Sequence, residues 1–137
     1  MKNILLVFIA LTFLAACSQE NDHAESHTHH HNKETELSLN NGERWEANPE
    51  TNEGIRKMLA ITSDYLNDRH GDLNVVHSEL EAEFQTIIQE CTMDGEAHDQ
   101  LHHFLHPLQE KMAELQEGHD NAEEIHSWLE MYSDYFK

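Results

Sequence analysis

Apolar residues recur at helical spacing in four separate segments of this 137-residue chain, and no other feature constrains its fold as tightly. Within each segment the apolar positions lie three or four residues apart, which places them on one face of a helix. Such a face has to be buried against another element, because an amphipathic helix alone leaves its apolar stripe in water. The pattern therefore predicts an all-α fold in which four helices pack together.

Turn and cap residues mark the boundaries of these helices. Asn48-Pro49 predicts the first helix start, with Asn as the cap and Pro at the first helical position. Gly71-Asp72 and Asp94-Gly95 predict the next two boundaries, and Gly118 ends the third helix, inside which Pro107 predicts a kink. Short connections favour antiparallel neighbours, so we expect an up-down-up-down four-helix bundle.

The fourth helix is predicted to start at Asp120 or Asn121 and to continue without a break to the end of its apolar stripe. The apolar residues that it should bury are Ala122, Ile125, Trp128, Leu129, Tyr132 and Phe136.

The first sixteen residues predict a signal peptide rather than a part of the bundle. Lys2 supplies a positive charge, Ile4 to Ala15 is an apolar run too short to span a bilayer, and Leu14-Ala15-Ala16-Cys17 has the small residues of a cleavage site. The stretch from Leu14 to Cys17 resembles the lipobox of bacterial lipoproteins, which implies cleavage before Cys17 and attachment of diacylglycerol to its sulfur. We expect residues 1–16 to be removed and the mature protein to be lipid-anchored in the bacterial cell envelope, at the outer membrane facing the periplasm. An ordinary signal peptide with a chance cysteine is the alternative.

Residues 17–36 form a polar tract without apolar periodicity, which predicts a lipidated, disordered tether. His27, His29, His30 and His31 make this tract a weak secondary metal-binding segment, since clustered histidines chelate Cu(II), zinc or nickel loosely. An expression tag would also be rich in histidine, but polar residues interrupt this one and a natural signal precedes it.

The ordered domain, residues 37–137, is predicted to begin with a short lead-in before the first helix. Leu37 and Leu39 alternate with polar residues up to Asn41-Gly42, a pair typical of a hairpin-like turn. Trp45 should then pack on the end of the helical body.

The net charge narrows the classes of partner. The chain has 27 acidic and 8 basic residues, and removal of the signal peptide takes away only Lys2 among them. This balance disfavours nucleic acid and anionic membrane surfaces and favours cations, although a solvated acidic surface is the commoner reason for it. No nucleophile and base pair, glycine-rich phosphate loop or haem motif indicates catalysis, so we expect a protein that is not an enzyme.

The segment from Cys91 to Pro107 carries the most specific chemistry. Lipidation of Cys17 would leave Cys91 as the one free thiol, and in an oxidising compartment such a thiol implies burial, intermolecular pairing or a metal. His98 and His102 lie four residues apart, so a helix points both imidazoles to the same side.

Cys91 and Met93 approach these histidines from across the predicted turn. Thiolate and thioether are soft donors that favour Cu(I), whereas zinc seldom recruits methionine. The sequence therefore predicts one Cu(I) site formed by Cys91, Met93, His98 and His102. The candidates to line it are Met58, Trp45 and Tyr132 or Tyr135.

Core packing is the alternative interpretation of the same residues. His98 falls on the apolar stripe of the third helix, and Cys91 extends the stripe of the second. In that case the chain would be a metal-free acidic interaction module that binds an envelope protein through its helices.

A dinuclear iron bundle is a less favoured third possibility, because it needs two Glu-x-x-His motifs and two further glutamates. Here Glu123-x-x-His126 is one match and Asp99-x-x-His102 only imitates the motif, so the full ligand count is missing. Four further histidines, His70, His77, His119 and His126, would gather toward the other end of the bundle. There, polar-face positions are the favoured interpretation over a second, harder metal site.

Two motifs resemble those of a family of small bacterial lipoproteins and secreted helical proteins. They are L-N-N-G-x-x-W, here Leu39 to Trp45, and C-T-M-x-G-x-x-H-D-x-L-H-x-x-L-H-P, here Cys91 to Pro107. The resemblance implies a periplasm-facing helical domain with links to heavy-metal handling. It implies no catalytic residues.

Overall fold

The computed structural model describes residues 36–68, 71–116 and 120–137. The predictions for the signal peptide, for Cys17 and for the tract histidines His27, His29, His30 and His31 lie outside these residues. The described residues form four main helices and one short one: α1 Pro49–Asp68, α2 Leu73–Glu90, α3 Gly95–Gln116, α4 Ala122–Glu130 and α5 Tyr132–Tyr135. The described part of the domain is therefore all-α, as predicted.

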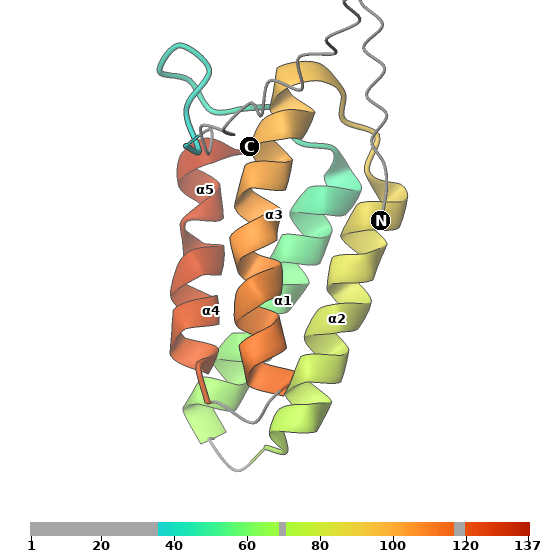
Figure 1. The fold of residues 1–137 in the computed structure, drawn as a ribbon, viewed down its shortest axis with the longest axis vertical. Coiled ribbons are helices and arrows are strands. Elements are labelled where there is room, and N and C mark those ends of the chain that lie inside the picture. Colours follow the sequence, from blue (N-terminus) through green and yellow to red (C-terminus); the bar gives the residue numbers. More distant parts are fainter. Residues whose placement is uncertain (1–35, 69–70, 117–119) are drawn as a thin grey trace, which may run out of the picture. The chain divides into compact units, whose positions relative to one another are not determined.

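The four main helices pack side by side. Helix α1 contacts both α2 and α4, while α3 contacts α2 on one side and α4 on the other. Figure 1 shows that successive helices from α1 to α4 run in opposite directions and that α5 continues the direction of α4, so the α2–α3 connection lies at the same end as the start of α1 and α5. None of the helices in the described ranges is both long and apolar enough to cross a membrane.

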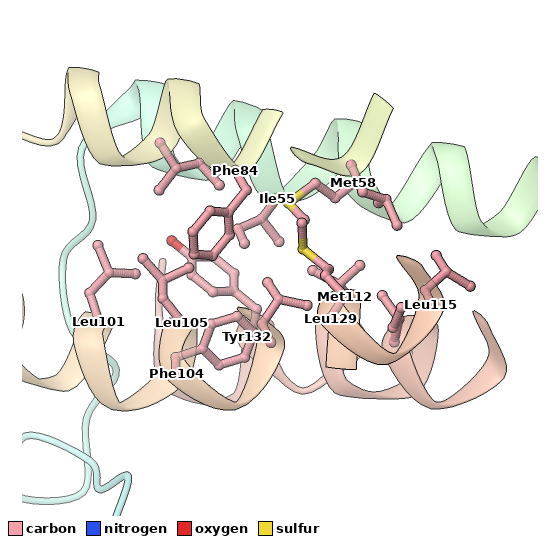
Figure 2. Close-up of a cluster of buried hydrophobic side chains, with 14 of the residues drawn as sticks. Ile55, Met58, Phe84, Leu101, Phe104, Leu105, Met112, Leu115, Leu129 and Tyr132 are labelled. Atoms are coloured by element: carbon pink, nitrogen blue, oxygen red, sulfur yellow. The ribbon is translucent and has the colours of Figure 1, made fainter. Parts of the chain in front are cut away.

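The core consists of apolar side chains from the inward face of every helix. Figure 2 shows side chains of α1 and α2, among them Ile55, Met58 and Phe84, facing those of α3, α4 and α5. The largest fully buried side chains include Leu80, Ile87, Phe104, Leu105, Leu108, Met112, Leu115 and Ile125. Each contributes roughly 1.5–3 kcal/mol by leaving water, so this interior is the main force that holds the helices together.

The predicted caps explain where the helices begin. Helix α1 starts directly after Asn48, whose Oδ1 accepts a hydrogen bond from Thr51 Oγ1 at 2.6 Å. Asp72 Oδ1 accepts from the backbone N–H of Asn74 at 2.9 Å and so caps α2. Helix α3 begins at Gly95 with a φ of +58°, a left-handed conformation that glycine adopts without steric cost.

The predicted hairpin-like turn is also present in the lead-in. Asn40 and Glu43 exchange two backbone hydrogen bonds, of 2.8 and 3.0 Å. Between them Asn41 and Gly42 both have positive φ, 53° and 92°, as the tightest two-residue hairpin turn requires. Trp45 packs on the end of the helical body with only 7% of its surface exposed, as predicted.

One continuous fourth helix through Phe136 was a wrong prediction. The chain turns at Met131 between α4 and α5, and Phe136 is extended with φ −125° and ψ 156°. It forms a parallel bridge with Trp45, because Trp45 N–H donates to Tyr135 O at 2.7 Å and Lys137 N–H donates to Trp45 O at 2.9 Å. Backbone pairing with the lead-in replaces the last helical turn, while Phe136 remains buried as predicted.

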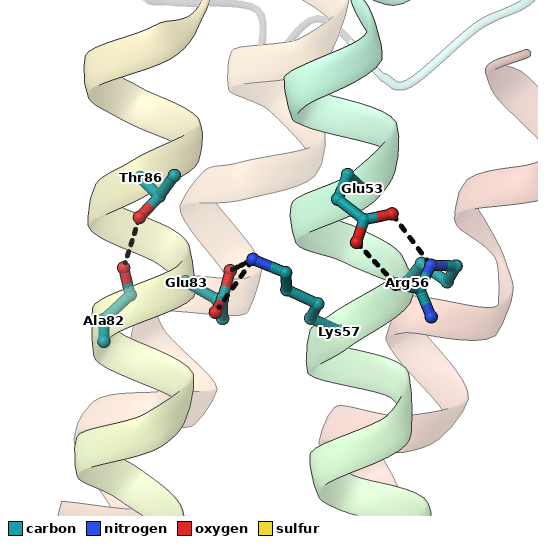
Figure 3. Close-up of polar contacts among 6 residues, drawn as sticks. All are labelled: Glu53, Arg56, Lys57, Ala82, Glu83 and Thr86. Atoms are coloured by element: carbon teal, nitrogen blue, oxygen red, sulfur yellow. Dashed lines mark hydrogen bonds and ion pairs between the residues drawn. The ribbon is translucent and has the colours of Figure 1, made fainter.

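Two further features concern the contacts between helices. Helix α3 continues through Pro107 to Gln116, and one turn before the proline the Phe104 carbonyl accepts a hydrogen bond from Trp128 Nε1 at 3.0 Å. On the outer side, Lys57 of α1 pairs with Glu83 of α2 at 3.1 Å (Figure 3). This half-buried pair on the outer side adds little to stability compared with the core.

Candidate metal site

The α2–α3 connection positions the predicted ligands. Helix α2 ends at Glu90, whose carbonyl accepts a hydrogen bond from Asn48 Nδ2 at 3.1 Å, and Cys91 follows with an extended backbone. Three more residues then lead to α3, which carries His98 in its first turn. Asp94 O accepts a backbone hydrogen bond from His98 N at 3.4 Å, so the connection and the histidine are coupled.

Three of the four predicted ligands form one chain of contacts. Cys91 Sγ lies 3.6 Å from His98 Nδ1, and His98 Nε2 lies 2.9 Å from His102 Nε2. The rings of His98 and His102 meet edge to face, with centroids 4.5 Å apart. Met93, the fourth, is half-buried and packs against the core from the same connection.

The separation of Cys91 Sγ and His98 Nδ1 is that of two ligands on one tetrahedral ion. A sulfur at about 2.3 Å and a nitrogen at about 2.0 Å from zinc lie about 3.5 Å apart at the tetrahedral angle. The observed separation is 3.6 Å, which is within hydrogen-bond range for sulfur and is also compatible with both atoms binding one ion of this size.

His102 has a different relation to this pair. Both ring nitrogens of His98 already have neighbours, Cys91 on one side and His102 on the other. An ion between Cys91 and His98 Nδ1 therefore lies across the ring from His102, and His102 or His98 must rotate before both imidazoles bind the same ion. Consistently, no three His, Cys, Asp or Glu side chains within residues 36–68, 71–116 and 120–137 are already arranged around one point suited to a metal ion.

The electrostatic environment keeps His102 in the form that binds metals. Burial lowers the pKa of His102, and positive charge on His98 and His106 lowers it further, while Asp99 opposes the shift. A lowered pKa favours the neutral imidazole, which is the ligand form of histidine.

Tyr132 lies near the cysteine, in agreement with its predicted place beside the site. Its hydroxyl donates to Asn52 Oδ1 at 2.9 Å. Burial raises the pKa of Tyr132, and negative charge on Cys91 adds to the rise. A second anion is thus disfavoured next to a Cys91 thiolate.

The lead-in covers the first turns of α3, beside the candidate ligands. Ser38 N–H donates to Gln100 Oε1 at 2.7 Å, and Trp45 Nε1 donates to Ser38 O at 2.6 Å. Gln100 is only 3% exposed. The burial of Gln100 was not predicted, because nothing in its spacing distinguishes it from a surface glutamine.

His106 was also missed, although its spacing carried a signal. It follows His102 by four residues, and their ring centroids lie 5.8 Å apart. His98, His102 and His106 therefore form a row along α3 that passes from the Cys91 contact to the exposed surface.

The other histidines are used differently. His126 Nδ1 lies 2.8 Å from Thr62 Oγ1, and its Nε2 lies 3.7 Å from Glu130. His77 is half-buried on α2, whereas His70 and His119 lie outside the described residues. The histidine of the Glu123-x-x-His126 motif therefore has two near partners: the Thr62 hydroxyl of α1 and the Glu130 carboxylate one turn along its own helix.

Comparison with protein-family models, with curated protein sequences and with solved structures finds no match to this chain.

Proposed function

We propose that this chain is a bacterial envelope lipoprotein that binds one soft metal ion, Cu(I), through Cys91, Met93, His98 and His102, and that it serves copper handling or tolerance. The observation that supports the proposal most directly is the 3.6 Å separation of Cys91 Sγ and His98 Nδ1, which matches the spacing of two ligands on one ion. A thiolate, a thioether and imidazoles together form a donor set that favours copper over harder metals.

Binding would follow from simple side-chain changes at the end of the bundle. The Cys91 thiol loses its proton to become a ligand, and the free N–H groups that open α3 reduce the cost of the resulting charge. Met93 adds a soft donor without charge, so the copper–thiolate pair stays neutral in a partly apolar pocket. Rotation of His102 about its side-chain bonds would complete the set.

The proposed architecture adds a bundle topology to the all-α domain and two segments before it. Residues 37–137 form an up-down-up-down four-helix bundle, preceded by a signal peptide at residues 1–16 and a lipidated, histidine-rich tether at residues 17–36. Cys17 would hold the protein to the outer membrane, facing the periplasm. Cys17→Ala should release the protein into soluble fractions or stall its processing, which membrane pelleting measures, and unchanged pelleting would exclude the anchor.

Anaerobic titration of Cu(I) against a competing chromogenic chelator tests the metal site. We expect Cys91→Ser to weaken binding most, His98→Ala and His102→Ala next, and Met93→Leu least. His103→Ala is the matched control, since His103 points about 100° away from His102 on the same helix. Parent-like affinity in Cys91→Ser would overturn the proposal.

A metal-free interaction module remains the second candidate function. It is favoured by the observation that the described side chains do not assemble three His, Cys, Asp or Glu donors around one point. If no variant changes Cu(I) affinity relative to the His103→Ala control, the contacts among Cys91, His98 and His102 serve packing, and this second function is preferred.

A further inference from the structure

The outward surface of α3 carries further donors beyond those of the proposed Cu(I) site, with which it shares His102. Asp99, His102, His103 and His106 occupy positions i, i+3, i+4 and i+7 of the helix, so their side chains leave from one face. We call these four residues the outer histidine patch. Asp99 and His106 are exposed, while His102 and His103 are half-buried.

One ring contact and one hollow link members of the patch. The His102 and His106 rings lie 5.8 Å apart at 63°. Glu96, Asp99, Gln100, His102 and His103 line a hollow on this surface. Imidazole and carboxylate groups therefore share the walls of the hollow, and His106 adjoins it through His102.

The donor chemistry of the patch differs from that at Cys91. It contains imidazole and carboxylate but no sulfur, and imidazole suits zinc, copper and nickel in their divalent states. Two histidines four residues apart on a helix are a recurring zinc-binding arrangement, with His102 and His106 at this spacing here. Because the outermost side chains are exposed, they can turn toward an ion without disturbing the core.

We propose that the outer histidine patch is a second metal site that binds a divalent transition-metal ion, with Zn²⁺ as the representative, through His102 and His106, with His103 and Asp99 as further ligands. The site does not depend on Cys91 and so does not rest on the proposed Cu(I) function. His102 is a proposed ligand of both sites, and its Nε2 lies 2.9 Å from His98 Nε2. An ion on the patch would therefore hold His102 away from the Cu(I) site.

Zinc titration of the full chain tests this site once competing ligands have been removed. The background variant carries Cys91→Ser together with asparagine in place of His23, His27, His29, His30 and His31, which eliminates the thiol and the histidine tract. In competition with a chromogenic zinc chelator, this background should bind one equivalent of Zn²⁺. His102→Ala and His106→Ala should each weaken that binding by about tenfold or more, and His103→Ala or Asp99→Asn by less.

His77→Ala on α2 is the matched control, because it removes a half-buried imidazole from another helix. It should leave the zinc affinity unchanged, and circular dichroism should show that each variant is folded. The proposal is overturned if the background binds no zinc, or if His102→Ala and His106→Ala behave like His77→Ala. Loss of Cu(I) binding in Cys91→Ser alongside such a result would leave the Cu(I) proposal standing, so the two failures can be told apart.

Discussion

Two histidines of this protein differ in the atoms that lie next to their rings: oxygen atoms in one case, sulfur and nitrogen atoms in the other. His126 of α4 has a hydroxyl at 2.8 Å and a carboxylate at 3.7 Å. His98 of α3 has a thiol at 3.6 Å and another imidazole at 2.9 Å. Oxygen partners fix the His126 ring as a link between α1 and α4, whereas every partner of His98 is itself a potential ligand of a soft metal.

The two histidines are distinguished by the chemical groups next to their rings and not by their burial. Both side chains are half-buried, so exposure alone would assign them the same function. Three experiments test whether this difference between the two regions holds.

The largest expected effect is on metal affinity. His98→Ala removes the imidazole next to the thiol, and we expect it to weaken Cu(I) binding by about 100-fold or more, above the range typical of groups outside the coordination sphere. His126→Ala should leave Cu(I) affinity at the parent value. Competition with a Cu(I) chelator measures both, and equal losses in the two variants would remove the distinction between the two histidines.

A smaller effect, on stability, is expected at the other histidine. Thr62 is fully buried, and Thr62→Val keeps its shape but leaves His126 Nδ1 without its hydroxyl partner. The free energy of unfolding should fall by about 1–3 kcal/mol, the cost of an unsatisfied buried polar group. Urea unfolding measures this change, and Cu(I) affinity should not move.

Thr86→Val provides the control for that measurement. The Thr86 hydroxyl donates to Ala82 O at 2.9 Å on the exposed side of α2 (Figure 3). Its loss should change the free energy of unfolding by less than about 0.5 kcal/mol, as for most surface substitutions. If Thr62→Val costs no more than Thr86→Val, the Thr62–His126 contact does not stabilise the fold.

The smallest effect concerns Tyr132, close to Cys91. Tyr132→Phe removes the hydrogen bond to Asn52 and should cost about 0.5–1.5 kcal/mol at neutral pH. Because burial and then the charge of Cys91 raise the pKa of Tyr132, the folded chain holds this proton above about pH 10, where an unfolded tyrosine releases it. The unfolded state is then favoured, so stability falls as pH rises through this range.

Unfolding curves measured between pH 9 and 11 should show this alkaline loss of stability in the parent and a smaller loss in Tyr132→Phe. Tyr135→Phe, one helical turn along, serves as the control. An identical alkaline slope in the parent and in Tyr132→Phe would mean that Tyr132 ionises as readily in the folded state as in the unfolded state.

Local signals in the sequence predicted most of the fold. Asn48, Asp72 and Gly95 act through groups within a few residues of themselves, so their spacing was sufficient to place the helix starts. The extended backbone at Phe136 was not predictable in this way, because it pairs with Trp45, which lies far away in the sequence. An apolar stripe continues through Tyr132 and Phe136 whether or not the last turn is helical.

In the candidate site, too, local spacing predicts some features, whereas others depend on packing between distant residues. Helical spacing predicts that His98 and His102 adjoin, and the structure places their rings 4.5 Å apart. It cannot predict which nitrogen of His98 faces Cys91, because ring orientation depends on the packing of the α2–α3 connection. Likewise the hydrogen bond from Ser38 to Gln100 joins residues that are 62 positions apart.

The pairing of Trp45 with Tyr135 and Lys137 also has a consequence for the order of assembly. These hydrogen bonds join residues about 90 positions apart, the largest sequence separation among the backbone hydrogen bonds described, and the entropy cost of closing a loop rises with its length. Helices α1 to α4 can align before these bonds form. We therefore expect the lead-in to dock late in folding, so that the first turns of α3, with the proposed metal ligands beside them, are covered only then.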